Sequence, residues 1–305
     1  MPDFCGCSIV VLTPNEKTVI EKRREKCLNK QTNICKMVTK QEIFDALCDM
    51  GAPKDKVVIF HSSLRSVGEI YGGAKAFLDA LIEYFTADGG LLCIPTHTWD
   101  NLGRDVPTLD MSSSHSCLGV LSRVAAEDKR GVRSLNPSHS MVVFGEREKA
   151  LEFIKDDAYI DTPTSPDSCY GKLYKLSGYV FLCGVSHNKN TYLHTVEEIL
   201  EIKNRMDTDY MNLSVRNTDG KISQRRMHLF KCSFSDDVSF RFHKYETAFR
   251  YHRCIKDGYI GNAPCQLCSA VGMKEVMALI MLRSGDRDPL ADEEPLDPRL
   301  YINQP

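Results

Sequence analysis

Short apolar runs alternate with amphipathic segments through most of the chain. Residues 57–63, 91–98, 140–145 and 179–185 each contain a nearly continuous apolar run, which predicts four buried strands. The segments between them, at 38–51, 72–90, 117–128, 148–157 and 170–178, have the patterns of helices. Buried strands that alternate with helices are typical of an α/β domain with a largely parallel central sheet flanked by helices.

Local signals add detail to this α/β pattern. Thr39 and Glu42 have the spacing of a capping box at the start of the first helix. Residues 211–230 form two alternating runs interrupted at Asn217–Gly220, which predicts an antiparallel hairpin. Residues 243–255 and 274–285 predict two further helices that pack back on the sheet.

The two ends of the chain differ from the middle. Residues 1–37 are charged, contain cysteines and have weak periodicity, so we interpret them as an N-terminal extension. Residues 286–305 are acidic and rich in proline, and we expect them to be an exposed tail. Residues 38–285 then form the single folded domain.

Composition excludes several classes of protein. The net charge of −2 over 305 residues gives no basic field for a nucleic-acid partner. The apolar runs are too short to span a bilayer, and the N-terminus lacks the pattern of a signal peptide, so we expect no membrane partner and a cytoplasmic location.

Thirteen cysteines are many for such a chain. Cys93 and Cys183 lie in apolar strands, so we interpret most of the cysteines as reduced core residues. Cys265 and Cys268 form a lone C-x-x-C without a second pair nearby, for which we prefer a structural role to zinc or redox chemistry.

Histidines lie next to all four predicted strands. His61, His97 and His187 follow strands, and His139 precedes one. Ligands of α/β sheets bind beyond the carboxyl ends of the strands. One such histidine is usually a buried residue with a structural hydrogen bond, but four of them favour a binding site.

The segment 184–202 holds the most specific chemistry. A helix begins at Thr191, and His194 shares one side of it with Glu197, Glu198 and Glu201. A carboxylate beside an imidazole gives the arrangement of a general base. Two alternatives are a solvated row of glutamates and a zinc site made by His187, His194 and Glu197. The His-x6-His spacing disfavours the zinc site, and we expect no metal.

A second candidate segment follows the first strand. "HSSLRSVGEIYGGAKAF" supplies hydroxyls, Arg65, a glycine pair that opens a helix, and Lys75, which together suit a phosphate group. The chain lacks the G-x-G-x-x-G and P-loop fingerprints of nucleotide binding, and it lacks the G-x-S-x-G elbow of the α/β-hydrolases.

Five segments together resemble one known family. They are "HSSLRSVGEIYGGAKAFLDAL", "LLCIPTHT", "RSLNPSHSMVVFG", "DTPTSPDSCYGKLYKLSGYVFLCGVSHNKNTYLHTVEE" and, more loosely, "GYIGNAPCQLCSA". In this order, over about residues 38–285, they resemble the aminoglycoside 3-N-acetyltransferases. The resemblance implies an antibiotic N-acetyltransferase-like fold, acetyl-coenzyme A as co-substrate, an amine-bearing small molecule as acceptor, and direct transfer without an acyl-enzyme.

The resemblance also implies roles for matching residues. His187 and His194 match the two functional histidines of the family, and Glu197 matches its acidic residue. The coenzyme is expected to contact the segment after the first strand, at Ser62, Ser63, Leu64, Arg65, Gly72, Gly73 and Lys75. On the acceptor side we expect His61, Thr96, His139 and Asp161.

The acceptor itself stays open at this point. An aminoglycoside carries several ammonium groups, so its pocket should be acidic, and Asp100, Asp105, Asp156, Asp157 and Asp161 are the candidates. Two alternatives to the acetyltransferase hypothesis are a metal-dependent hydrolase that uses the histidine loops and a non-catalytic family member with an altered acceptor site.

Overall fold

The computed structural model describes residues 37–231, 237–285 and 287–302. The chain divides into two compact units, residues 1–37 and 38–305. The predicted N-terminal extension therefore lies outside the described residues, except for Met37, and the following description concerns the second unit.

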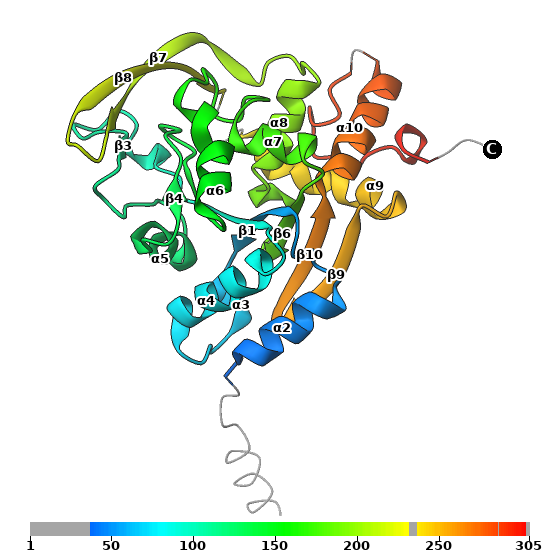
Figure 1. Cartoon of the computed structure of the whole chain (residues 1–305). Helices are drawn as coiled ribbons and strands as arrows, with labels where there is room; N and C mark the ends of the chain where they lie inside the picture. Colours follow the sequence, from blue (N-terminus) through cyan, green and yellow to red (C-terminus); the bar gives the residue numbers. More distant parts are fainter. Residues whose placement is uncertain (1–36, 232–236, 286, 303–305) are drawn as a thin grey trace, which may run out of the picture. The chain divides into compact units, whose positions relative to one another are not determined.

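Helices and strands alternate along this unit (Figure 1). The α-helices are α2 (Lys40–Asp49), α3 (Leu64–Val67), α4 (Gly73–Thr86), α5 (Val120–Glu127), α6 (Arg147–Ile154), α7 (Cys169–Lys175), α8 (Tyr192–Ile199), α9 (Glu246–Tyr251) and α10 (Ala270–Ser284). The 3-10 helices are η1 (Trp99–Asn101), η2 (Lys155–Ala158), η3 (His187–Lys189), η4 (Val238–Tyr245) and η5 (Pro298–Leu300). The strands are β1 (Val57–Ser62), β2 (Leu91–Pro95), β3 (Leu109–Asp110), β4 (Val132–Arg133), β5 (Met141–Phe144), β6 (Tyr179–Cys183), β7 (Met206–Arg216), β8 (Ile222–Phe230), β9 (Ile255–Ile260) and β10 (Ala263–Ser269).

Seven strands form the central sheet, in the order β4-β5-β2-β1-β6-β10-β9. The three strands at its centre are parallel, because β1 pairs in parallel with both β2 and β6. The pairs β2–β5, β4–β5, β6–β10 and β9–β10 are antiparallel. The parallel pairing predicted for the sheet is thus found at its centre, and the whole sheet is mixed.

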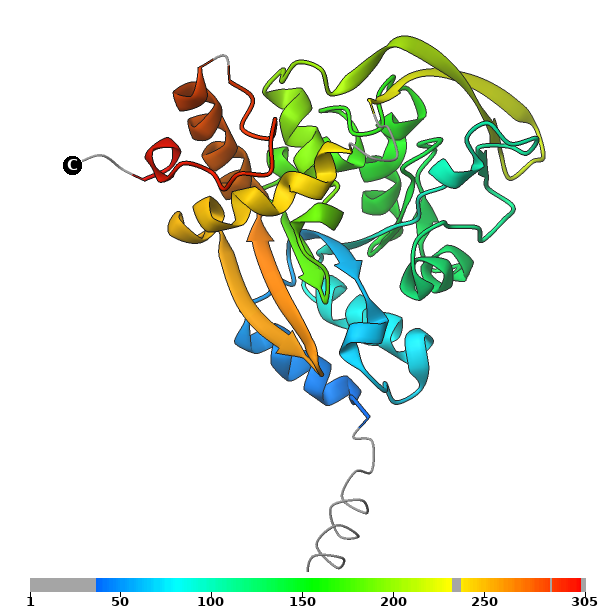
Figure 2. The same cartoon turned by 180° about the vertical axis from the view of Figure 1, so that it is seen from behind.

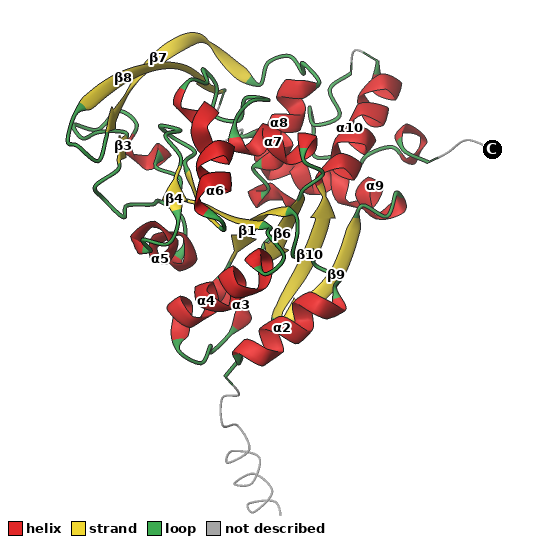
Figure 3. Cartoon of the chain, viewed as in Figure 1, coloured by secondary structure: helices red, strands yellow, loops and turns green. Residues whose placement is uncertain are grey.

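Alternate residues of the strands point to opposite faces of the sheet, and both faces are buried. Ile59, Cys93 and Met141 belong to one core, which helices α6 to α10 cover. Phe60, Ile94 and their neighbours belong to the other core, beneath α2, α4 and α5. Figures 1 and 2 show these two layers of helices from opposite sides, and Figure 3 marks the sheet between them. The predicted α/β class is confirmed.

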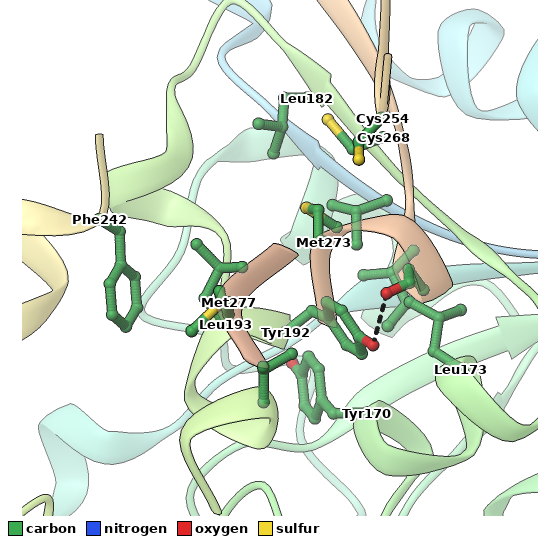
Figure 4. Packing of buried hydrophobic residues seen from close by; sticks show 14 of the residues in the cluster. Tyr170, Leu173, Leu182, Tyr192, Leu193, Phe242, Cys254, Cys268, Met273 and Met277 are labelled. Atoms are coloured by element: carbon green, nitrogen blue, oxygen red, sulfur yellow. Dashed lines mark hydrogen bonds between the residues drawn. The ribbon is translucent and has the colours of Figure 1, made fainter. Parts of the chain in front are cut away.

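The core beneath α8 and α10 is closely packed (Figure 4). Tyr192 and Tyr170 are fully buried there, and the hydroxyl of Tyr192 donates to the carbonyl oxygen of Ala270 at 2.9 Å. This contact joins the start of α8 to the start of α10. Helix α8, which bears His194, is therefore packed against the buried core of the domain.

Most of the predicted local elements are present. The capping box at Thr39 and Glu42 begins α2, and β7 and β8 form the predicted hairpin, with a turn closed by Gly220 donating to Asn217. Strands β9 and β10 were not predicted. The short strand β3 pairs in parallel with β7 and completes a second sheet of three strands, in the order β3-β7-β8, so the loop after β2 is attached to the hairpin.

The C-terminal segment corrects one expectation. Residues 286–305 were expected to be an exposed tail, but within the described part, residues 287–302, Leu290, Leu296 and Tyr301 are buried and belong to the core beneath α6 to α10. Hydrogen bonds add to this anchoring, since His252 pairs with the carbonyl oxygen of Tyr301 at 2.8 Å. Apolar side chains spaced along the acidic sequence hold the segment against the domain.

The cysteines within the described ranges are free thiols. Cys93 and Cys183 are buried in strands, as predicted. Cys265 and Cys268 lie on β10 but belong to the two different cores, because residues three apart on a strand point to opposite faces. Their sulfur atoms therefore cannot share one metal ion. Among the described helices, none is long and apolar enough to cross a membrane.

Candidate active site

The sheet brings three histidines to one edge. β1 and β2 are parallel, so the residues after both strands lie at the same edge, and antiparallel β5 begins there, with Met141 opposite Pro95. His61, His97 and His139 continue the odd-numbered series of Ile59, Cys93 and Met141, which faces α8. The rings of His97 and His139 lie 4.4 Å apart. The predicted convergence of histidine loops is thus present for these three.

Helix α8 supplies the fourth histidine. His194 is 8% exposed, and its Nδ1 lies 3.3 Å from Oε2 of Glu197, which is 1% exposed. The other oxygen of Glu197 accepts from Nε of Arg205. Because both carboxylate oxygens accept, Nδ1 of His194 is the donating nitrogen and Nε2 keeps its lone pair. This is the arrangement of a general base held by a carboxylate.

Two aromatic rings fix the imidazole of His194. Phe230, the last residue of β8, stacks on it with ring centroids 4.1 Å apart and an interplanar angle of 24°. Phe242 of η4 meets it edge-on at 4.8 Å. Phe230 also contacts His139, at 5.3 Å and 90°. The rings of His97, His139, Phe230 and His194 therefore form one continuous series of contacts.

The other glutamates of the helix have different roles. Glu198 accepts from the hydroxyls of Thr162 and Thr164, and burial raises its pKa. Glu201 lies beyond the end of α8, with φ of 53°, and is exposed. Glu197 is thus the partner of His194, a choice between Glu197 and Glu198 that the helical spacing left open.

Burial keeps the histidines of this edge neutral. It lowers the pKa of His61 to about 4 and that of His139 to about 3, with the charge of His194 adding to the effect on His139. Burial also lowers the pKa of His97 well below its ordinary value. Nε2 of His97 pairs with the hydroxyl of Tyr170 at 2.7 Å. The site therefore offers neutral imidazoles at physiological pH.

His187 does not lie at the surface of this site. Its side chain is fully buried, its ring packs on Phe249 at 5.2 Å, and Nδ1 lies 3.1 Å from Nδ2 of Asn190. Burial lowers its pKa to about 4, and its charged neighbours are Glu246 and Arg250. η3 thus turns the side chain of His187 inward before α8 begins, and the catalytic role expected for His187 stays a prediction.

The predicted coenzyme segment begins at Ser62, directly after His61 at the end of β1. Ser62, Ser63 and Leu64 are partly exposed and Arg65 is exposed, directly after β1. Gly72 and Gly73 are exposed at the start of α4, with φ of 75° and 68°, a backbone conformation that favours glycine. No side chain caps this helix and its first turn carries no acidic residue, so its N–H groups suit an anion.

Lys75 differs from the rest of that segment. Its ammonium group lies 2.6 Å from Asp79 and 3.3 Å from Asp128, and the hydrogen bond with Asp79 raises its pKa. Two carboxylates thus already neutralise the charge expected to meet the coenzyme. Arg65 makes no ion pair with any residue in the described ranges, so it is the better candidate.

The acceptor-side residues are divided. Thr96 is fully buried, and its hydroxyl lies 3.2 Å from that of Ser140, so it packs behind the histidine loop, and its expected contact with the substrate stays a prediction. Asp161 is exposed, beside Glu198. Of the other aspartates, Asp157 is fully buried, whereas Asp100 pairs with His115 and Asp156 with Lys172.

Some residues of the site were not selected from the sequence. His97 was recognised only as part of a loop at the end of a strand. Because side chains alternate between the two faces along a strand, the sequence could have indicated that His97, and not Thr96, continues the series of Cys93 on the face of the site. Phe230 and Arg205 flank the hairpin, with Phe230 opposite Met206, and no local pattern marks them. Over the described ranges, no three His, Cys, Asp or Glu side chains are placed to hold a metal ion.

Comparison with known proteins assigns the chain to a family. The sequence model of the family described as aminoglycoside 3-N-acetyltransferase matches residues 59–281. A Bacillus subtilis relative, the SPbeta prophage-derived aminoglycoside N(3')-acetyltransferase-like protein YokD, is 26% identical over 255 residues, which cover 76% of this chain and 88% of the relative.

Two solved structures share the fold. The aminoglycoside acetyltransferase AAC-IIIb, in its binary complex with CoASH, aligns with a TM-score of 0.69 and 21% identity, over 83% of this chain and 100% of that one. A mutant of AAC(3)-IVa in complex with a gentamicin aligns with a TM-score of 0.68 and 22% identity, over 88% and 93%. Because the family match spans well over half of its residues, this chain belongs to the aminoglycoside 3-N-acetyltransferases, a family of acyltransferases.

Proposed function

We propose that this protein transfers the acetyl group of acetyl-coenzyme A directly to an amino group of an aminoglycoside or a related polyamine-like acceptor, with His194 as general base. The observation that carries the proposal is the contact of Nδ1 of His194 with Glu197 beside the histidine edge of the sheet. Family membership supplies the reaction class and the co-substrate.

The acceptor must lose its charge before it can react. An alkylammonium has a pKa near that of lysine, about 10, so at neutral pH most of it is protonated and not nucleophilic. The neutral amine attacks the thioester carbonyl carbon, forming the C–N bond and breaking the C–S bond. Nε2 of His194 takes the first proton from the ammonium, which leaves the neutral amine, and passes it to solvent. The second proton, lost by nitrogen as the C–N bond forms, passes to the departing sulfur, which leaves as the thiol of coenzyme A.

Residues at the end of β1 support the other half of the reaction. The hydroxyls of Ser62 and Ser63 are partly exposed next to the histidines and are the candidates to donate to the thioester oxygen as it gains charge. The backbone N–H of Ser63 already donates to Cys183 at 2.9 Å, so it is not available for this role. Arg65 and the glycine-opened start of α4 suit the phosphates of the coenzyme.

The acceptor class follows from two considerations. AAC(3)-IVa, which shares the fold, has been solved with a gentamicin bound. In this chain, Asp161 is exposed near the site and the neighbouring imidazoles are neutral, so they accept hydrogen bonds from ammonium groups without repelling them.

The test is a thiol-release assay with acetyl-coenzyme A across aminoglycosides, linear polyamines and simple amines, with mass spectrometry of the products. The proposal expects a mono-N-acetylated product and one thiol for each acetyl group transferred. Binding of the coenzyme without turnover of any acceptor would favour the non-catalytic family member. Stoichiometric zinc, with hydrolysis and no coenzyme binding, would favour the hydrolase.

Hydrogen exchange locates the coenzyme independently of turnover. Coenzyme A is expected to slow exchange of the backbone amides within residues 62–75. Protection confined to residues 200–300 would contradict the assignment of the coenzyme segment.

A further inference from the structure

Arg205 lies between the candidate catalytic pair and the C-terminal segment. Its Nε donates to Oε1 of Glu197, while its Nη1 and Nη2 donate to the two oxygens of Asp288 at 2.8 and 2.9 Å. Arg205 is 9% exposed. A guanidinium that binds one carboxylate with its fork and a second with Nε holds both in fixed orientations.

The contact with Glu197 uses the oxygen that His194 does not. Oε2 faces Nδ1 of His194 and Oε1 faces Arg205, so the plane of the carboxylate is fixed from both sides. Arg205 directly precedes β7, and Phe230, which stacks on His194, lies opposite Met206 at the base of the same hairpin. The base of the β7–β8 hairpin therefore holds both His194, through Phe230, and Glu197, through Arg205.

We propose that Arg205, anchored by Asp288, is a positioning residue for acetyl transfer: it orients Glu197 toward His194 and makes the pair release its proton more readily. The inference rests on the proposed function for its consequence in catalysis, but its electrostatic content concerns the folded protein alone. It also assigns a role to the C-terminal segment, which supplies Asp288.

The direction of the electrostatic effect follows from charge. A cation next to Glu197 opposes the binding of a proton anywhere on the His194–Glu197 pair, and Asp288 partly offsets that cation. The other charged or titratable groups near the network are His97, His139 and Glu198 beside His194, Tyr245 beside Glu197, and Lys244 beside Asp288. These groups are the same in every variant compared below.

Removing Arg205 and removing Asp288 must therefore shift the pH at which the His194–Glu197 pair loses its proton in opposite directions. In Arg205→Met, the pair should hold its proton to higher pH, and the acid limb of kcat/KM should move up by about one pH unit. In Asp288→Asn, the charge of Arg205 is less neutralised, so the acid limb of the kcat/KM profile should move to lower pH. Arg205→Lys keeps the charge and should keep the limb near its wild-type position, although kcat falls because the fork is lost.

Two measurements test the inference on the full chain. The first is the pH profile of kcat/KM with acetyl-coenzyme A. The second is NMR titration of the His194 ring in protein labelled with ¹³C-histidine, with the signal assigned by its loss in His194→Gln. Arg299→Met and Asp297→Asn are the matched controls, since they make the same charge changes in an exposed ion pair of the same segment.

Opposite shifts of the His194 titration in Arg205→Met and Asp288→Asn, with no shift in the controls, would support the inference. Folded Arg205→Met and Asp288→Asn variants that titrate like the wild type, or that shift in the same direction, would overturn it. If Arg205→Met does not fold, a downward shift in Asp288→Asn together with no shift in Arg205→Lys would support the inference, and an Asp288→Asn titration that is unshifted or shifted upward would overturn it. A wild-type protein without transferase activity would contradict the proposed function, whereas the NMR titration would still decide the role of Arg205.

Discussion

Phe230 covers one face of the His194 imidazole, with the two ring centroids 4.1 Å apart and the rings nearly parallel. The two residues are 36 positions apart in the sequence and meet because the β7–β8 hairpin returns the chain to α8. Since Phe242 closes the ring from a second side, the stack fixes the direction of Nε2, the atom proposed to take the proton.

Phe230→Ala is therefore expected to lower kcat roughly fivefold, since an aromatic pair of this kind contributes about 1 kcal/mol. The KM for acetyl-coenzyme A should change little, because Phe230 is not part of the coenzyme segment. Steady-state kinetics measure this split. Tyr259→Ala, which removes an exposed aromatic ring from β9, is the control. A Phe230→Ala enzyme with wild-type kcat would show that the stack does not orient the base.

The buried histidines predict a pH dependence of stability. Burial lowers the pKa of His61 and His187 to about 4, whereas an unfolded histidine titrates near pH 6.5. Between these values the unfolded state binds more protons than the folded state, so the free energy of unfolding falls as pH decreases from about 6.5 to about 4. The loss amounts to on the order of 3 kcal/mol for each histidine at the low end.

Urea unfolding at several pH values from 7.5 to 5 checks this slope. The variant His187→Asn should flatten it, because one of the contributing groups is gone, and should also be less stable at pH 7.5. His243→Gln, at an exposed histidine, should keep the wild-type slope. Unfolding free energies that do not depend on pH over this range would contradict the burial argument.

The ion pairs of Lys75 predict an unequal contribution of two cations to coenzyme binding. Arg65→Ala should weaken binding of coenzyme A roughly tenfold, since a charge-assisted hydrogen bond contributes about 1.5–3 kcal/mol. Lys75→Ala should change the affinity less than about threefold, because Asp79 and Asp128 already neutralise its charge. Isothermal titration of both variants measures the difference. A larger loss of affinity in Lys75→Ala than in Arg65→Ala would contradict this prediction and would support a contact between Lys75 and the coenzyme.

The fold was largely predictable because its signals are local. Apolar runs such as 57–62 and 91–95 are long enough to specify buried strands, and the capping box and the hairpin turn mark ends of elements. Strands β9 and β10 were not predicted, because their exposed side carries polar and charged residues and Gly258 interrupts the alternation of apolar and polar residues in β9. The C-terminal segment was wrongly expected to be exposed, because its composition is mainly acidic and only a few apolar residues anchor it to the core.

The site was predictable where neighbouring residues make it. His194 and Glu197 are one helical turn apart, so their contact follows from the helix itself. The burial of His187 was not predicted, because the 3-10 helix η3, which no spacing rule specifies, turns its ring into the core. Phe230 reaches His194 from the far strand of the hairpin, and Arg205 reaches Glu197 after the irregular segment that follows α8. Asp288 binds Arg205 from the C-terminal segment. No local pattern in the sequence specifies these contacts.

The role of His194 as the base is tested most directly by comparing kcat/KM of the wild type and His194→Ala from pH 6 to pH 10, with folding and coenzyme A binding verified for both. We expect the variant to fold, to bind coenzyme A and to be slower by about 10²–10⁴ at neutral pH. The deficit should narrow as pH approaches the pKa of the amine, about 10, where the acceptor no longer needs a base. His243→Ala serves as the control. A folded His194→Ala protein that acetylates at the wild-type rate across this range would contradict the mechanism.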